Sequence, residues 1–178
     1  MSDDERVQKE PGTSTALVRR QEKAPHLSDD VAMQKLWLAT QRREWRSLAV
    51  VAADDDVSTL EVATRLAEIA WWYRGQPTNV FDLRELGLRL VDYQLREIEA
   101  QVAQGDCVII ALSSIFANPT TIAVATAADA AVLCVKLGAT KMKGAEKTIR
   151  EIGQAKFLGS IAINPAAPPA SAPKKGKP

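Results

Sequence analysis

Short apolar runs alternate with longer amphipathic stretches through the central part of the chain. Five of the runs show no alternation of polar and apolar positions, a pattern typical of strands that are buried on both faces of a parallel sheet. They cover residues 48–53, 79–83, 107–112, 130–135 and 157–163. The stretches between them carry apolar residues every three or four positions, which predicts helices that cover a sheet.

Four helices are expected between the strands. Three of them cover residues 59–73, 120–127 and 143–154. The other, second in chain order, contains Val91, Leu95, Ile98 and Val102 and ends near Gly105. The first is expected to bury Val62, Ala63, Leu66, Ala70 and Tyr73. Right-handed crossovers place such helices on both faces, so the order predicts a three-layer α/β fold with a mostly parallel sheet of about five strands. Ligands of such sheets bind beyond the carboxyl ends of strands, so we expect any chemistry in the loops after Ala53, Leu83 and Leu112.

Polar segments flank this region. Residues 1–26 are rich in charged residues, Gln, Ser, Thr and Pro and lack regular apolar spacing, which predicts a flexible leader. Residues 165–178 combine Pro, small residues and Lys, which predicts a disordered tail. The domain itself is expected to cover residues 27–164 and to open with a helix from the N-cap Ser28 to about Arg43.

Charge and cysteine content narrow the function classes. The chain has 23 Lys and Arg against 22 Asp and Glu, so its net charge does not indicate a nucleic-acid partner. Its two cysteines, Cys107 and Cys134, lie inside apolar runs, as buried thiols of proteins from a reducing cytoplasm do. The N-terminal segment lacks an apolar signal-peptide core, and no apolar run approaches the roughly 20 residues of a membrane-spanning helix. We therefore expect a cytoplasmic protein.

The loop after the first predicted strand reads AADDDVST, where phosphate-binding proteins place a glycine-rich turn and a lysine. Here both are absent. Asp54, Asp55 and Asp56 are expected to repel a triphosphate, by roughly 1 kcal/mol for each close pair of charges in a water-like dielectric. Ser58 and Glu61 match a capping box, through which the next helix satisfies its own free amides. A Mg²⁺ or Ca²⁺ site at the three aspartates is the alternative.

Two further stretches carry a resemblance to a known family. They are the segment 106–164, which begins DCVIIALSSIFANPTT and ends GSIAIN, and the motif VFDLRE at residues 80–85. Both are similar to the cytoplasmic tyrosine-kinase-like ATPases of bacterial capsule and exopolysaccharide assembly, which belong with the ParA and MinD type of P-loop proteins. The resemblance covers about residues 48–164 and implies a P-loop NTPase-like fold.

The resemblance also assigns positions within the motifs. Asp82 and Arg84 match the second acidic motif of the family. In the family, the strand equivalent to CVIIAL ends in an aspartate that organises magnesium. In this sequence the matching position is Ala111. Ser113 and Ser114 follow that strand, and with no base evident near them we expect them to cap a turn. The degenerate pocket thus comprises Asp54, Asp55, Asp56, Ser58, Thr59, Asp82 and Ala111, with no catalytic residue, cofactor or metal.

Other departures from the family concern phosphorylation and assembly. Active members end in a tyrosine-rich tail, whereas the two tyrosines here, Tyr73 and Tyr93, lie in predicted helices. The family's ring-forming Glu-x-x-Arg-x-x-Arg pattern is replaced by Val31, Gln34 and Trp37. We therefore expect neither autophosphorylation nor the same ring.

Tryptophan is abundant for a chain with few aromatic residues. Adjacent Trp71 and Trp72 cannot both point into one helix–sheet interface, so one of them is expected to face outward. Because exposed aromatic residues commonly anchor interfaces, Trp37, Trp71 and Trp72 are the interface candidates, with packing under the N-terminal helix as the alternative.

Together these features predict a non-catalytic pseudo-ATPase or pseudokinase that serves exopolysaccharide or capsule assembly through protein–protein interaction. The expected partner is a membrane-bound polysaccharide co-polymerase or an active tyrosine kinase or ATPase homologue, reached in the cytoplasm or at the inner membrane, with a homo- or hetero-oligomer as a further expectation. One alternative is an active ATPase or tyrosine kinase with an atypical nucleotide loop, in which Asp82, Lys141 or Lys143 substitutes for the missing groups. Another is a ParA- or MinD-like positioning factor.

Overall fold

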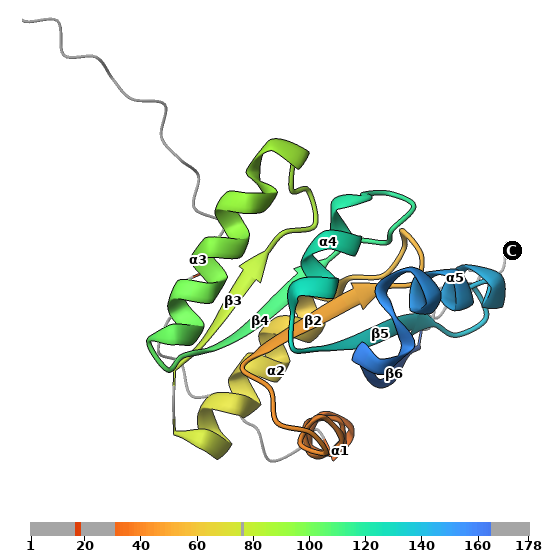
Figure 1. The fold of residues 1–178 in the computed structure, drawn as a ribbon. Coiled ribbons are helices and arrows are strands. Elements are labelled where there is room, and N and C mark those ends of the chain that lie inside the picture. Colours follow the sequence, from red (N-terminus) through yellow and green to blue (C-terminus); the bar gives the residue numbers. More distant parts are fainter. Residues whose placement is uncertain (1–16, 19–30, 76, 165–178) are drawn as a thin grey trace, which may run out of the picture.

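The computed structural model describes residues 17–18, 31–75 and 77–164, which form one sheet between two layers of helices (Figure 1). The strands are β1 (Leu17–Val18), β2 (Ser47–Ala52), β3 (Thr78–Asp82), β4 (Cys107–Leu112), β5 (Ala130–Lys136) and β6 (Phe157–Ile163). The α-helices are α1 (Val31–Thr40), α2 (Thr59–Arg74), α3 (Val91–Ala103), α4 (Thr120–Ala127) and α5 (Met142–Ile152). Two short 3₁₀ helices, η1 (Leu88–Leu90) and η2 (Gln154–Lys156), precede α3 and β6.

The strand order is β1-β3-β4-β2-β5-β6. Strands β2 to β6 run parallel to one another, which confirms the predicted α/β fold with a mostly parallel sheet of about five strands. The short β1 pairs antiparallel with β3, so two residues of the expected leader join the sheet. The rest of the leader and the expected tail at 165–178 lie outside the described residues.

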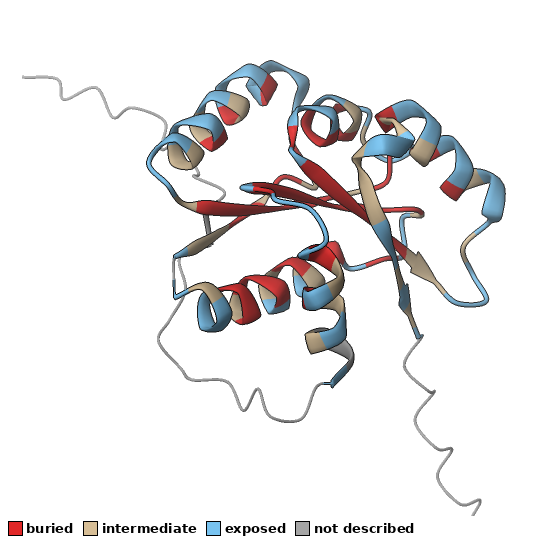
Figure 2. Cartoon of the chain, turned by 60° about the horizontal axis from the view of Figure 1, so that its bottom comes forward, coloured by how far each residue is buried: buried red, intermediate tan, exposed pale blue. Residues whose placement is uncertain are grey.

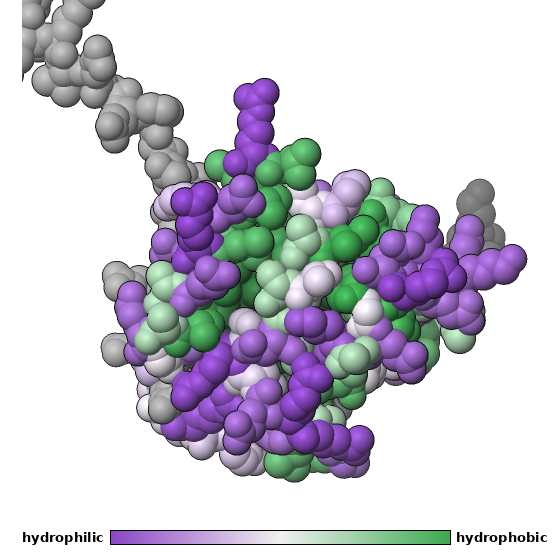
Figure 3. Space-filling model, in the orientation of Figure 1, coloured by the Kyte–Doolittle hydropathy of each residue, from purple (hydrophilic) through white to green (hydrophobic). Residues whose placement is uncertain are grey.

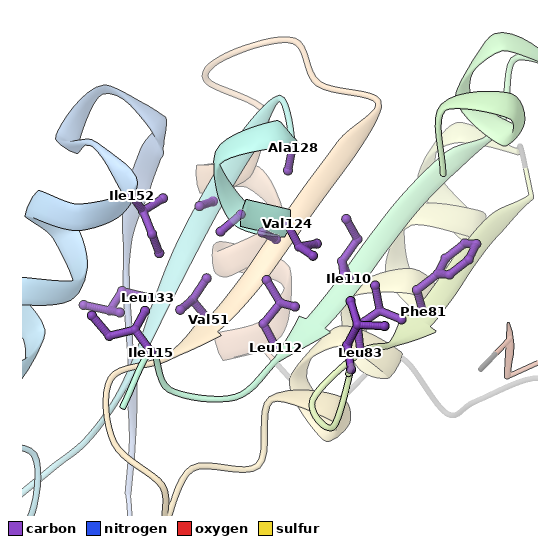
Figure 4. Packing of buried hydrophobic residues seen from close by; sticks show 14 of the residues in the cluster. Val51, Phe81, Leu83, Ile110, Leu112, Ile115, Val124, Ala128, Leu133 and Ile152 are labelled. Carbon is purple, nitrogen blue, oxygen red and sulfur yellow. The ribbon is translucent and has the colours of Figure 1, made fainter. Parts of the chain in front are cut away.

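Alternate residues of each central strand face opposite layers of helices. In β2, Leu48 and Val50 pack with residues of α2, whereas Ala49 and Val51 pack with residues of α3, α4 and α5. Every residue of β2 and of β4 is buried, which explains their uninterrupted apolar sequences (Figure 2). On the second face, Val51 lies in one apolar cluster with Val124 of α4 (Figure 4).

Helix α1 is shorter than predicted at its C-terminal end. It ends at Thr40, where the side-chain hydroxyl donates a hydrogen bond of 2.7 Å to the carbonyl of Trp37, rather than continuing to Arg43. The chain then turns, and the Arg43 guanidinium donates hydrogen bonds to the carbonyls of Ala155 and Asp129. The predicted N-cap, Ser28, lies outside the described residues.

Helix α2 buries a slightly different face from the predicted one. Leu66 and Ala70 are buried as expected, but Tyr73 is 59% exposed and packs its ring 6.4 Å from that of Trp37. The helix ends at Arg74 because Gly75 adopts a left-handed conformation with φ 62°, which a residue without a side chain adopts at little cost.

The surface carries hydrophilic side chains over much of its area, most continuously over α5 (Figure 3). Among the described residues, no helix has both the length and the apolar character needed to cross a membrane.

Candidate functional site

The turn between β2 and α2 occupies the place of a phosphate-binding loop. From Ala52, the last residue of β2, to Thr59, the first of α2, it has the eight-residue length of the motif G-x-x-x-x-G-K-[ST]. Ala52 and Val57 stand where that motif has glycine, and Ser58 stands where it has lysine. The turn therefore has the length of a phosphate loop and its final Ser/Thr, and it lacks the two glycines and the lysine.

Side-chain hydrogen bonds tie this turn to the neighbouring strand. The hydroxyl of Ser114, just beyond β4, donates to Oδ1 of Asp55 and accepts the amide of Ala117 at 3.1 Å. The hydroxyl of Thr59 donates to the carbonyl of Leu112 at 2.9 Å. In P-loop proteins the hydroxyl at this position binds Mg²⁺, so here a structural bond replaces that contact.

The predicted capping box is wrong. Ser58 does occupy the N-cap position of α2, with φ −80° and ψ 90°, but its side chain makes no capping hydrogen bond. Glu61 instead lies one helical turn before Arg65 and forms an ion pair with it at 3.5 Å. The sequence S-x-x-E is compatible with a capping box, but the Glu61 carboxylate pairs with Arg65 of the same helix instead.

The three aspartates do not converge. Asp54 points toward the first turn of α5, where its Oδ1 lies 3.6 Å from the position of a Cβ built on Gly144, and its buried Oδ2 has no hydrogen-bond partner among the described residues. Asp55 contacts Ser114, and Asp56 is exposed. In the part of the chain that the structure describes, no group of three His, Cys, Asp or Glu side chains is placed to hold a metal ion.

Asp82 and Arg84 form a bidentate ion pair beside the turn. The guanidinium donates two bonds of 2.7 Å, one to each carboxylate oxygen, and the side chains are 26% and 37% exposed. Hydrogen bonds from Arg84 hold the pKa of Asp82 below its usual value against the opposing effect of partial burial. Asp82 is aligned in the sheet with Ala111, which is fully buried and offers no carboxylate. The acidic residue that matches the family motif is thus already neutralised by its neighbour.

A small hollow of about 330 Å³ lies between these two turns. It is lined by Ala52, Asp55, Val57, Arg84, Glu85, Ser113, Ser114, Ala117 and Asn118. The Ser113 hydroxyl donates to the carbonyl of Arg84 at 2.8 Å, and the Asn118 amide donates to that of Leu86 at 3.0 Å. The predicted turn-capping role is confirmed for Ser114, whose hydroxyl accepts an amide of its own turn, whereas the Ser113 hydroxyl bonds the turn after β3. Sequence reasoning missed that Asp55 lies against Ser114.

The three interface candidates separate into two groups. Trp37 is only 1% exposed and packs edge-on against Trp45, with ring centroids 5.9 Å apart, so it is not available to a partner in this fold. Trp71 and Trp72 are 48% and 50% exposed, and their rings contact each other edge-on at 5.3 Å. Both adjacent tryptophans therefore face outward, where the sequence predicted one.

Two cysteines and two lysines are the remaining reactive side chains that the sequence analysis considered. Both cysteines are unpaired and buried, and burial raises the pKa of the Cys134 thiol to about 12. Lys141 and Lys143, the alternative cations, are exposed around the start of α5 and form no hydrogen bond or ion pair with Asp55 or Asp82 within the described residues.

Comparisons with known proteins identify the fold. No protein-family model matches the sequence, and no curated protein matches it. The kinase domain of Escherichia coli tyrosine kinase ETK is 16% identical with a TM-score of 0.59, over 78% of this chain and 76% of that chain. The chimerical protein CapA2B2 is 13% identical with a TM-score of 0.55, over 86% of this chain and 90% of that one. The BceF tyrosine kinase domain is 13% identical with a TM-score of 0.53, over 75% and 73%. The chain therefore shares the α/β, P-loop NTPase-like fold of these tyrosine kinase domains.

Proposed function

We propose that this protein is a degenerate member of the capsule and exopolysaccharide tyrosine-kinase-like family. It acts as a non-catalytic accessory or regulatory protein of polysaccharide assembly, through contacts with other proteins. The motifs at residues 80–85 and 106–164 and the fold shared with the ETK and BceF kinase domains support the family. Loss of catalysis is the separate part of the proposal and rests on the turn after β2.

The turn between β2 and α2, which has aspartates and no glycine or lysine, is the observation that supports this proposal. A triphosphate needs backbone amides and a cation, and Ala52, Val57 and Ser58 supply neither the close backbone approach nor the charge. Asp55 adds a negative charge that is anchored at the turn by Ser114. Each close charge pair opposes the nucleotide by roughly 1 kcal/mol or more, depending on the local dielectric.

The proposed partner is a membrane-bound polysaccharide co-polymerase or an active tyrosine kinase or ATPase homologue. Contact with such a partner would place the protein in the cytoplasm or at the inner membrane. Trp71 and Trp72 are the proposed anchors, because large aromatic side chains lose water on binding and dominate interface energetics. No catalytic group of this chain takes part.

Calorimetric titration with ATP and Mg²⁺ tests the loss of catalysis. The expected result is no saturable binding at the turn and no hydrolysis, with the ETK kinase domain as a reference under the same conditions. Hydrolysis that disappears in Asp82→Ala would overturn the proposal in favour of an active enzyme with an atypical nucleotide loop.

Capture of partners from the native cell tests the proposed role. The proposed role is supported if the parent protein retains a polysaccharide co-polymerase or kinase and the double variant Trp71→Ala/Trp72→Ala does not. Retention of partition or division proteins instead supports the ParA- or MinD-like alternative.

A further inference from the structure

A second hollow, of about 780 Å³, lies at the opposite edge of the sheet from the phosphate-loop turn. It is lined by Arg43, Glu44, Trp45, Arg46, Arg74, Asp129 and Lys156. Arg46, Asp129 and Lys156 each directly precede a strand, namely β2, β5 and β6, and Arg74 ends α2. The hollow therefore lies at the amino edge of the sheet, remote from the site proposed above.

Basic side chains dominate this hollow, with four cations against the two carboxylates of Glu44 and Asp129. Within the described residues, none of the four cations forms an ion pair with a carboxylate. The excess of two cations over carboxylates in the lining gives the hollow a positive potential that attracts anions.

Hydrogen bonds to backbone carbonyls hold three of these cations in place. Arg43 donates to the carbonyl of Ala155 at 2.8 Å and also to that of Asp129. Arg46 donates to the carbonyl of Gly105 at 2.9 Å, and Lys156 to that of Ala128 at 2.7 Å. These carbonyls lie at or just beyond helix ends, where cations are favoured, so the bonds fix the cations without neutralising their full charge.

Three of the four cations keep donors for a ligand. A guanidinium has five N–H groups and an ammonium three, and the bonds above occupy only some of them. Arg74 is held more tightly, over the rings of Trp37 and Trp45 at 5.3 and 4.7 Å, with further bonds to Gln41 and Cys107. The available donors are therefore those of Arg43, Arg46 and Lys156.

The two carboxylates of the hollow differ in availability. Asp129 accepts the backbone amides of Arg46 and Ser47, at 2.8 and 2.9 Å, so one of its oxygens is already engaged. Glu44 is exposed, and no bond to it is present among the described residues. Glu44 is thus the one lining group that opposes an anion and can be removed without breaking a described contact.

We propose that this hollow binds a phosphate dianion, either free phosphate or a phosphate monoester. Two negative charges match the excess of two cations over carboxylates in the lining. Phosphate oxygens also accept the paired N–H groups of a guanidinium, and a phosphate dianion carries twice the charge of a carboxylate such as acetate. Trp45 is 4% exposed, so the site recognises the phosphate group rather than an aromatic ring stacked on tryptophan.

Calorimetric titration of the full chain with sodium phosphate, with glycerol phosphate and with sodium acetate tests this site. We expect phosphate to bind with a Kd of roughly millimolar or tighter and acetate to bind more weakly. Glycerol phosphate that binds at least as tightly as free phosphate identifies a monoester site, and weaker binding identifies a site for the free ion. Each charge-assisted bond lost should weaken phosphate binding about tenfold or more, so Arg46→Gln and Lys156→Gln are both expected to do so.

Two matched variants separate a built site from loss of fold or general charge. Glu44→Gln should tighten phosphate binding, a gain that misfolding does not produce. Arg89→Gln removes one exposed positive charge from η1, outside the hollow, and should leave the Kd unchanged. Equal Kd values for the parent, Arg46→Gln and Arg89→Gln, or no phosphate binding by the parent, overturn the proposal. If a nucleotide binds in this hollow through its phosphates, Arg46→Gln should weaken its binding and Asp82→Ala should not. The hollow and the turn after β2 are therefore tested separately.

Discussion

The hydroxyl of Ser114 donates a hydrogen bond to Oδ1 of Asp55 and thereby joins the turn after β4 to the turn after β2. Ser114 is fully buried, whereas Asp55 is exposed, so the bond anchors an acidic surface residue to the interior of the protein. In a phosphate loop this space admits the ligand. Here a hydrogen bond between the two turns takes the place of a contact with a ligand.

Ser114→Ala should destabilise the protein by about 1–2 kcal/mol, because it removes the donor to Asp55 and the acceptor of the Ala117 amide. Urea unfolding at neutral pH measures the change. Ser160→Ala is the matched control, since Ser160 is exposed on β6. A change no larger than that of the control would mean that the contact does not hold the turn.

Much of the fold is predictable from the sequence because its central strands are buried on both faces. A strand of this kind must be apolar throughout, and the predicted range 107–112 coincides with β4. The predicted ranges 120–127 and 157–163 also coincide with helix α4 and with the partly exposed strand β6. Errors concentrate at helix α1 and at the last turn of α2, where burial depends on how one helix packs on the other. That packing decides which aromatic residues face water, and no local pattern encodes it.

The candidate site is less predictable because it depends on strand order. Asp55 and Ser114 are 59 positions apart, and they meet because β2 and β4 are neighbours in the sheet. The sequence indicates that both turns lie at the same edge, but not that they touch. The capping box fails for a different reason, since Ser58 occupies the right backbone position while Glu61 pairs with Arg65.

Trp37→Ala and Trp71→Ala should have very different effects on stability. Truncating the buried Trp37 leaves a cavity beside Trp45 and should cost about 3–5 kcal/mol, whereas truncating the half-exposed Trp71 should cost less than about 1 kcal/mol. Thermal unfolding followed by circular dichroism compares them. Similar losses for both variants would contradict the assignment of Trp71 to the surface.

Arg74→Lys should destabilise the protein by about 1–2 kcal/mol although it keeps the charge. The guanidinium lies 4.7 Å from the ring centroid of Trp45 and donates to Cys107, and an ammonium cannot reproduce the planar stack together with several directed bonds. We also expect a shift in tryptophan fluorescence, because the ring environment changes. Arg96→Lys, on the exposed side of α3, is the control, and an equal loss there would show that the stack contributes nothing.

Asp129→Asn should make stability less dependent on pH in acid. Partial burial alone would raise the pKa of Asp129, but the amides of Arg46 and Ser47 outweigh it and hold that pKa below the ordinary value of 3.8. The unfolded chain therefore takes up the proton first as the pH falls. The carboxylate contributes its stability above pH 3.8 and loses it as the pH falls through the lower folded pKa.

Urea unfolding of the parent and Asp129→Asn between pH 7 and pH 3 measures this contribution. The difference in free energy of unfolding should be largest at neutral pH and should shrink at the acid end, because protonation removes the charge that the variant lacks. Glu99→Gln, which removes an exposed carboxylate of α3, should show no such convergence. A constant difference for Asp129→Asn across the range would show that the geometry of the two amide bonds matters and the carboxylate charge does not.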